Sequence, residues 1–174
     1  MRKLRAIGRL LALLWHLLGG IAIVYLRFPR MDLAARRARV EQWQGRLVAI
    51  CGLRLELHGT PALPADGRGV LQISNHISWL DISTLHGIRF CRFVSKSEVK
   101  HWPVVGRLAY AADTLYLQRA SRRDAHRVLE QIAARLQAGD VVTVFPEGTT
   151  SDGVDLLPFH ANMFQAAIQA DAPI

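Results

Sequence analysis

The sequence contains only two cysteines, Cys51 and Cys91, among its 174 residues. Two thiols cannot form a disulfide scaffold or a four-cysteine zinc site, and both lie in apolar stretches that are typical of core thiols. The chain also lacks the H-E-x-x-H spacing of zinc sites and the G-x-S-x-G turn that carries a nucleophilic serine. Apolar residues make up 51% of the chain and charged residues 21%, which excludes disorder as a description of the whole.

Acidic residues are scarce in the first fifty positions and balance the basic ones elsewhere. Residues 1–50 contain ten Lys/Arg and two Asp/Glu, whereas residues 51–174 contain twelve of each. The whole net charge of +8 therefore belongs to the N-terminal third. This distribution argues against a basic groove across a folded domain, and so against a nucleic-acid partner. We divide the chain into a basic helical segment (1–50) and one domain (51–174), a length that suits a real core.

The N-terminal segment is also the most apolar part of the chain. An uncharged run from Leu10 to Leu26 lies between two basic ends, and its seventeen residues would span roughly 26 Å as a helix. A bilayer core is about 30 Å thick, so the run suits a helix that lies in the interface or enters one leaflet. Trp15 and Tyr25 suit an interfacial position. A signal peptide and a buried core helix are the alternatives, but no small-residue cleavage motif is present.

After this segment the apolar pattern changes repeatedly between helix and strand. A helix is predicted over 32–51 with Gly52 as its C-cap, and a half-exposed strand over 53–58, where apolar and polar residues alternate. A second helix is predicted over 121–138 with Ser121 as its N-cap. Short apolar runs predict four buried strands, at 70–74, 93–94, 114–117 and 141–145. Strands that alternate with helices indicate an α/β fold, a mostly parallel sheet flanked by helices.

The C-terminal residues resemble the opening of a further strand. Ala172-Pro-Ile174 follows a helical stretch over 163–170, and a domain rarely stops at such a point. We therefore expect the domain to be incomplete at its C-terminus.

Two polar clusters directly follow predicted strands. The segment 74–81 (Ser-Asn-His-Ile-Ser-Trp-Leu-Asp) comes after the strand 70–74, and the segment 145–153 (Phe-Pro-Glu-Gly-Thr-Thr-Ser-Asp-Gly) follows the strand 141–145. In parallel α/β sheets ligands bind beyond the carboxyl ends of strands. We therefore expect the two clusters to form one shared site.

His76 and Asp81 are the candidate acid–base pair of this site. Residues five apart do not meet on a continuous helix, but they can meet when the histidine lies on a turn and the aspartate in the next helix. Asp81 would then fix the imidazole tautomer, and the other ring nitrogen would take a proton from a hydroxyl. A surface histidine near an N-capping aspartate is the alternative. Without a serine elbow or a reactive cysteine, the nucleophile is expected to be a substrate hydroxyl.

Three further features suit the binding of phosphate or hydroxyl groups. A tight turn with free backbone N–H groups and hydroxyls can hold such groups, and the sequence places one at Glu147, Gly148 and Thr149. Arg119 at the end of the strand 114–118, and Lys96, are candidate phosphate clamps, with a solvated surface cation as the alternative for each. The histidine and carboxylates of the two clusters match no metal-ligand spacing, so no metal is predicted.

The two clusters together resemble the glycerolipid acyltransferase family, whose type member is 1-acylglycerol-3-phosphate (lysophosphatidate) acyltransferase. The family's first block, N-H-x-x-x-x-D, matches the segment 75–81, and its third block, F-P-E-G-T, matches 145–149. The stretch 93–106 resembles its K-x-E…P-x-x-G stretch, 115–119 its second block, and 173–174 the start of its fourth. The resemblance runs from about residue 50 to the end, and four blocks in order make it specific.

The resemblance implies a chemistry. His76 would act as general base with help from Asp81, and the acceptor hydroxyl would attack the thioester of acyl-CoA or acyl-acyl-carrier protein directly. The phosphate end of the acceptor would be bound by Arg119 and the turn 147–149. Lys96 would also bind the substrate. No cofactor beyond the acyl donor is implied.

The resemblance also implies a setting for this reaction. The acceptor would be a lyso-lipid such as 1-acylglycerol-3-phosphate in phospholipid biosynthesis. The partners would be membrane lipids and the acyl donor, and the protein would lie on the cytoplasmic face of the bacterial inner membrane. The oligomeric state is left open.

Two positions depart from the family pattern. Thr150 stands where an arginine is frequent, and Gln118 precedes Arg119 where an aspartate is common. Because one phosphate-facing cation is missing, another acceptor such as lyso-ornithine lipid or a lysophospholipid is an alternative. Two other hypotheses are a non-catalytic membrane lipid-binding protein and a membrane-anchored hydrolase that uses His76 and Asp81.

Overall fold

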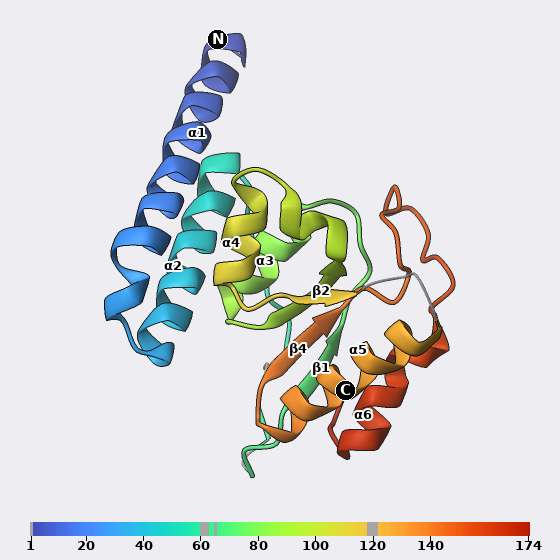
Figure 1. Ribbon diagram of the computed structural model, residues 1–174. Helices are drawn as coiled ribbons and strands as arrows, with labels where there is room; N and C mark the ends of the chain where they lie inside the picture. The colour runs from blue at the N-terminus through green and yellow to red at the C-terminus, as the bar shows by residue number, and fades with distance from the viewer. Residues whose placement is uncertain (1, 60–62, 65, 118–121) are drawn as a thin grey trace.

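The computed structural model describes residues 2–59, 63–64, 66–117 and 122–174 (Figure 1). Its elements, in chain order, are α1 (Arg2–Leu26), η1 (Phe28–Arg30), α2 (Leu33–Cys51), β1 (Val70–Ile73), α3 (Leu80–Ile88), β2 (Arg92–Lys96), η2 (Ser97–His101), α4 (Val105–Ala111), β3 (Leu115–Leu117), α5 (Arg122–Gln137), β4 (Val141–Val144), η3 (Ala161–Phe164) and α6 (Gln165–Ala170).

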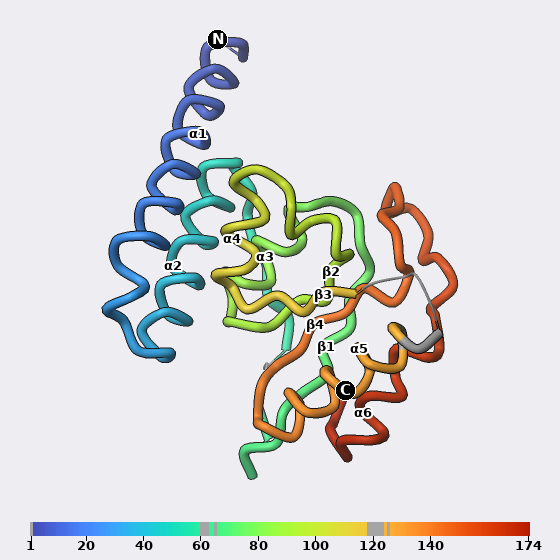
Figure 2. The backbone as a smooth tube through the Cα atoms, viewed as in Figure 1, coloured from blue at the N-terminus to red at the C-terminus, as the bar shows by residue number. Residues whose placement is uncertain are grey.

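The described strands form one parallel sheet in the order β1-β4-β2-β3. β4 lies between β1 and β2, with Val141 opposite Val70 and Val142 opposite Arg92. Helices α5 and α6 lie on one side of the sheet, and α3 and α4, with the α1–α2 pair, lie on the other (Figures 1 and 2). The predicted α/β fold with a parallel sheet is confirmed, and its strand order places the carboxyl ends of β1 and β4 side by side.

The main core fills the space between the sheet and α5. Leu71 of β1 and Val142 of β4 are fully buried against Ile132 and Leu136 of α5. The last two lie four residues apart on one face of the helix, which is the spacing that an amphipathic helix needs to bury an apolar stripe. Each such side chain contributes about 1.5–3 kcal/mol by leaving water. This packing makes the sheet a rigid platform for the loops at its edge.

The helix predicted over 32–51 is α2, and its ends have the expected caps. The Asp32 carboxylate accepts a hydrogen bond from Ala35 N at 2.7 Å. Gly52 ends the helix in the left-handed region at φ 76°, where a side chain would be strained. Helix α5 agrees with the second predicted helix, but its predicted N-cap, Ser121, lies outside the described residues.

The strand predicted over 53–58 is wrong. These residues have no regular secondary structure and all of them are exposed. Alternation of Leu53, Leu55 and Leu57 with polar residues marks a two-faced strand only when a neighbouring strand supplies the hydrogen bonds. In the described part of the chain no strand lies beside this segment.

The predicted C-terminal helical stretch divides into η3 and α6. Beyond it, Pro173 O accepts a hydrogen bond from Leu71 N at 3.0 Å. The last residues therefore run beside β1, at the edge of the sheet.

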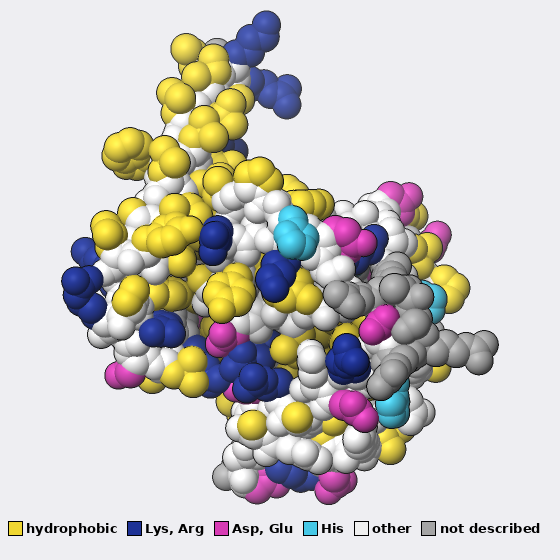
Figure 3. All heavy atoms as spheres, in the orientation of Figure 1, with side chains coloured by type: hydrophobic (Ala, Val, Ile, Leu, Met, Phe, Trp, Pro, Cys, Tyr) yellow, Lys and Arg dark blue, Asp and Glu magenta, His cyan; other side chains and the backbone are white. Residues whose placement is uncertain are grey.

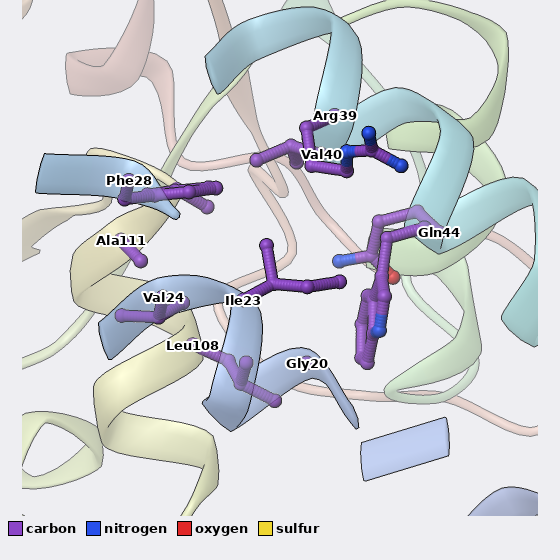
Figure 4. A pocket seen from close by; sticks show the side chains of 11 residues that line it. Gly20, Ile23, Val24, Phe28, Arg39, Val40, Gln44, Leu108 and Ala111 are labelled. Carbon is purple, nitrogen blue, oxygen red and sulfur yellow. The ribbon is translucent and has the colours of Figure 1, made fainter. Parts of the chain in front are cut away.

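The second half of α1 docks on α2 through an interlocked histidine–tryptophan contact. His16 Nε2 donates to Trp43 O at 2.9 Å, and Trp43 Nε1 donates to His16 O at 3.3 Å. The two rings stack with centroids 4.4 Å apart. A Cβ on Gly20 would lie 2.8 Å from the Trp43 ring, so only glycine lets the helices approach this closely. Residues from α1, α2 and α4 surround a small void of about 30 Å³ beside this contact (Figure 4).

The first half of α1 extends away from the domain and leaves its apolar side chains in solvent (Figures 1 and 3). Leu4 is 75% exposed, Leu10 56% and Leu11 61%. Among the described helices, the stretch Arg2–Arg30 is long and apolar enough to cross a membrane by length and composition, and only 6% of its apolar 18-residue window is buried. A helix this exposed is not a core helix, which removes that alternative.

His86 is a buried, uncharged histidine on α3. It is 1% exposed; its Nε2 donates to Cys91 O at 2.7 Å, and its Nδ1 accepts from Gln44 Nε2 at 3.4 Å. Burial lowers the pKa of His86 from 6.5 to about 4. Burial likewise raises the pKa of the Cys91 thiol to about 11, which leaves it an inert core side chain.

We predict that His86 makes the fold acid-sensitive. Between pH 6.5 and pH 4 the unfolded chain takes up a proton at this residue and the folded chain does not. The contribution of His86 to the free energy of unfolding is therefore complete above pH 6.5. As the pH is lowered toward 4, this contribution decreases by about 3 kcal/mol at most. Urea unfolding at pH 7, 5.5 and 4 should show this loss in the wild type and a smaller loss in His86→Gln, which stays neutral. Equal losses in both proteins would contradict the assignment.

Candidate active site

His76 lies on the turn after β1 and Asp81 in the first turn of α3, as the site hypothesis requires. His76 Nδ1 and Asp81 Oδ2 are 2.7 Å apart. The same oxygen accepts hydrogen bonds from Ile77 N at 2.7 Å and Ser78 N at 2.9 Å. Three contacts therefore converge on one carboxylate oxygen, and the five-residue spacing is closed by the turn.

This geometry determines which nitrogen of the imidazole carries the proton. An oxygen that accepts from two backbone N–H groups is an acceptor, so His76 Nδ1 is the donor in its contact with Asp81. In the neutral ring Nε2 then holds a free lone pair. A lone pair held in a fixed direction by a carboxylate partner is the arrangement of a general base.

The second cluster fixes the backbone of His76. Glu147 Oε1 accepts from His76 N at 3.2 Å, and His76 O accepts from Ser151 N at 2.8 Å. Glu147 is 4% exposed, and its other oxygen, Oε2, is buried without a partner among the described residues. The loops after β1 and β4 are thus joined at the histidine, which confirms the expectation that the two clusters meet.

An aromatic stack supports the imidazole from one side. The Phe145 ring lies 4.0 Å from the His76 ring with an interplanar angle of 12°. Phe93 of β2 stacks in turn on Phe145 at 5.6 Å. The plane of the histidine is therefore set by the end of β4, while its tautomer is set by α3.

An apolar cavity of about 220 Å³ opens beside the imidazole. His76 and Phe145 line it at the edge of the sheet, and Leu17 of α1 and Trp43 and Leu47 of α2 line it on the other side. The remaining wall comes mostly from α3, β2 and α4. The cavity therefore connects the candidate base with the inner surface of the α1–α2 pair.

The remaining predicted site residues lie near this edge or outside the described chain. Lys96 ends β2 at the carboxyl side of the sheet and is exposed. Gly148, at φ 70°, donates its N–H to Phe145 O at 3.0 Å, and Thr149 is exposed. Arg119 lies outside the described residues. Within the described ranges, no three His, Cys, Asp or Glu side chains are grouped to hold a metal ion.

Sequence reasoning missed three parts of the site. Ser151 lies in the second cluster, but no local pattern indicated that its N–H would bind His76 O. The stacking of Phe145 and the position of the cavity depend on side chains from distant elements. An aromatic residue at the end of a strand, directly before the Pro-Glu-Gly turn, was the one local signal for the stack.

Comparisons with known proteins identify the family of the chain. The sequence model of the Acyltransferase family matches residues 54–174. The 1-acyl-sn-glycerol-3-phosphate acyltransferase of Neisseria meningitidis is 42% identical over 79% of this chain and 53% of its own length. The lyso-ornithine lipid O-acyltransferase of Pseudomonas aeruginosa is 34% identical over the whole chain and 67% of its own length. The chain spans about half the length of the first of these relatives.

A solved structure shares the fold. The crystal structure of the 1-acyl-sn-glycerophosphate acyltransferase from Thermotoga maritima superposes with a TM-score of 0.72. The superposition covers 97% of this chain and 72% of the Thermotoga maritima chain. The two sequences are 23% identical, a level that supports the fold alone.

We predict that Asp81 sets the tautomer of His76. Long-range ¹H–¹⁵N spectra of the wild type should show a protonated Nδ1 and an unprotonated Nε2, because Asp81 accepts from Nδ1. In Asp81→Ala the Nδ1–H loses its acceptor, and the spectrum should shift to a mixture of tautomers. The variant also leaves the backbone N–H groups of Ile77 and Ser78 without their acceptor, which should lower the free energy of unfolding by about 1–3 kcal/mol. An unchanged tautomer in the variant would contradict this role.

Proposed function

The chain belongs to the acyltransferase family, and on that premise we propose that it transfers an acyl chain from a thioester donor to a hydroxyl of a lyso-lipid. The observation that carries the proposal is the His76–Asp81 contact at the mouth of an apolar cavity. A proton acceptor and a space for a hydrocarbon chain are the two parts that such a transfer requires.

The chain's own residues supply the proton transfers of this reaction. His76 Nε2 takes the proton of the acceptor hydroxyl as the hydroxyl oxygen attacks the thioester carbonyl carbon. The carbon–sulfur bond then breaks, and the leaving thiolate receives the proton from the imidazolium. Asp81 stabilises the imidazolium through Nδ1. An ester and a free thiol result, with no acyl-enzyme.

The cavity suits the acyl chain of the donor. Its walls are mostly apolar, so a hydrocarbon chain gains about 0.8 kcal/mol for each methylene it buries there. With the carbonyl carbon beside His76, the chain points toward α1 and α2. Acyl-CoA and acyl-acyl-carrier protein present the same thioester to this site.

Glu147 positions the base in this proposal. A carboxylate repels a phosphate, and Glu147 Oε1 accepts from the backbone N–H of His76. We assign the phosphate end of the acceptor to the cations Lys96 and Arg119 and to the exposed end of the turn at Thr149. This differs from the expectation that the whole turn binds phosphate, because Gly148 N already donates to Phe145 O.

Two acceptors fit the proposal. The first is 1-acylglycerol-3-phosphate, the substrate in the name of the Neisseria relative. The second is lyso-ornithine lipid, named for the Pseudomonas relative, and it is favoured by Thr150 in place of a phosphate-facing arginine. Both offer a hydroxyl on a lipid, so the same base serves either. We place the protein on the cytoplasmic face of the inner membrane, where the thioester donors are found.

We predict that His76→Ala abolishes the transfer. The rate should fall by about 10²–10⁴-fold because the positioned base is lost. The assay uses a labelled acyl donor with a panel of lyso-lipids, and the product is separated from free fatty acid. His58→Ala, an exposed histidine on the coil after α2, is the matched control and should keep full activity.

The same assay separates the alternatives. Unchanged activity in His76→Ala would remove the base assignment. Labelled fatty acid released without any acceptor would indicate a hydrolase. A folded, membrane-bound protein that gives no product from any acceptor would indicate lipid binding without catalysis.

We also predict that the exposed face of α1 holds the protein on the membrane. Leu11 and Leu18 lie seven residues apart on one face of the helix, and both are exposed. Leu11→Glu and Leu18→Glu together should move the protein toward the soluble fraction, since each leucine contributes about 1.5–3 kcal/mol when buried. Gln42→Glu, an exposed position on α2, is the control. Full sedimentation of the double variant with membranes would count against the anchor.

A further inference from the structure

A second cleft, of about 500 Å³, lies between the α1–α2 connection and the edge strand β3. Its cationic lining residues are Arg36, Arg37, Arg92, Lys100 and Arg135. We propose that this cleft binds the phosphate group of an anionic membrane phospholipid, at a site separate from the catalytic one.

The cleft lies toward the opposite end of the strands from His76. Arg92 begins β2, and Asp113 precedes β3, whereas His76 and Glu147 follow the carboxyl ends of β1 and β4. The strands are parallel, so these groups lie at opposite ends of the strands; among the cleft's cations, Lys100 differs in that its element, η2, follows the carboxyl end of β2. Only Thr114 lines both this cleft and the apolar cavity beside His76. Figure 3 shows the Lys and Arg side chains that gather between α2 and α5.

The cleft has more positive charge than its carboxylates neutralise. Asp140 pairs with Arg37 at 2.5 Å and with Arg92 at 2.7 Å. Asp113 pairs with Arg92 at 3.0 Å. Five cations therefore face two carboxylates, which leaves a net charge of +3.

Three of the five cations supply this excess. Arg36 Nε donates to the Phe28 carbonyl, which carries no charge. Lys100 and Arg135 make no ion pair with any other described residue, and both are exposed. Such a surplus of donors attracts an anion that accepts several hydrogen bonds, as phosphate does.

Two polar atoms of the cleft residues are buried without a partner. Arg37 Nε and Tyr116 Oη make no hydrogen bond within the described part of the chain. A buried donor left unpaired costs about 1–3 kcal/mol, so native proteins keep few of them. Neither atom has exposed surface in the cleft, so the exposed cations, and not these two groups, are the direct donors to a phosphate group.

The apolar half of the cleft indicates that the phosphate is carried on a lipid. Val24 of α1, Phe28 and Pro29 of η1 and Leu33 of α2 line the same space. Tyr25 and Leu26, at the end of α1, lie between the lining residues Val24 and Phe28 in the sequence. Tyr25 is 55% exposed and Leu26 is 65% exposed. A ligand with an anionic head and a hydrocarbon tail matches both halves, whereas free phosphate matches only one.

The test measures lipid binding directly, without the acyl donor. The full chain in neutral detergent is titrated calorimetrically with dihexanoyl-phosphatidylglycerol, with the zwitterionic dihexanoyl-phosphatidylcholine, and with inorganic phosphate. Arg135→Gln removes one cleft cation; Arg46→Gln, an exposed position on α2 outside the cleft, removes the same charge elsewhere. Lys100→Gln repeats the cleft test on a second exposed residue.

We expect phosphatidylglycerol to bind the wild type more tightly than either other ligand. Its affinity should fall about fivefold in Arg135→Gln and in Lys100→Gln and less than twofold in Arg46→Gln. Equal losses in the cleft and control variants would show general surface attraction and overturn the site. Equal affinity for phosphatidylcholine, or for inorganic phosphate, would overturn the anionic lipid as its ligand. His76→Ala should bind normally, so this result is independent of the acyl transfer.

Discussion

The site depends on one carboxylate oxygen. Asp81 Oδ2 holds the imidazole of His76 and two backbone N–H groups of the same turn, so the turn, the start of α3 and the tautomer form together. Because one acceptor satisfies both the backbone and the ring, removing it disturbs local folding and chemistry at once. The sheet adds the second constraint: β1 and β4 are neighbours, which brings Glu147 and Ser151 to the backbone of His76.

The sequence was sufficient for the parts that local chemistry determines. Helix α2 has its aspartate and glycine caps where the pattern placed them, and the strands follow short apolar runs bounded by polar turns. The spacing of His76 and Asp81 allowed their contact but left a surface histidine as the alternative, and the family resemblance favoured the contact that the structure shows. The meeting of the two clusters followed from a general property of parallel sheets, that their carboxyl ends share an edge.

The remaining features depend on contacts between distant residues. Leu53, Leu55 and Leu57 have the alternation of a strand, but pairing with a neighbour decides whether a strand forms, and sequence alternation carries no information about that neighbour. The N–H of Ser151 reaches a carbonyl 75 residues earlier in the chain. The position of Glu147 after a strand favoured a phosphate-binding turn, and only the three-dimensional contact shows its carboxylate on the backbone N–H of His76.

The two helices of the basic N-terminal segment connect the proposed membrane anchor with the candidate base. Trp43 is held against α1 by its reciprocal hydrogen bonds with His16 and by the missing side chain at Gly20. The same Trp43, with Leu17, lines the apolar cavity that reaches His76. The helix pair forms one wall of the cavity, so under the proposed function its packing affects both the membrane anchor and the space for the hydrocarbon chain. The tight packing at Gly20 is therefore a constraint on the site as well as on the anchor.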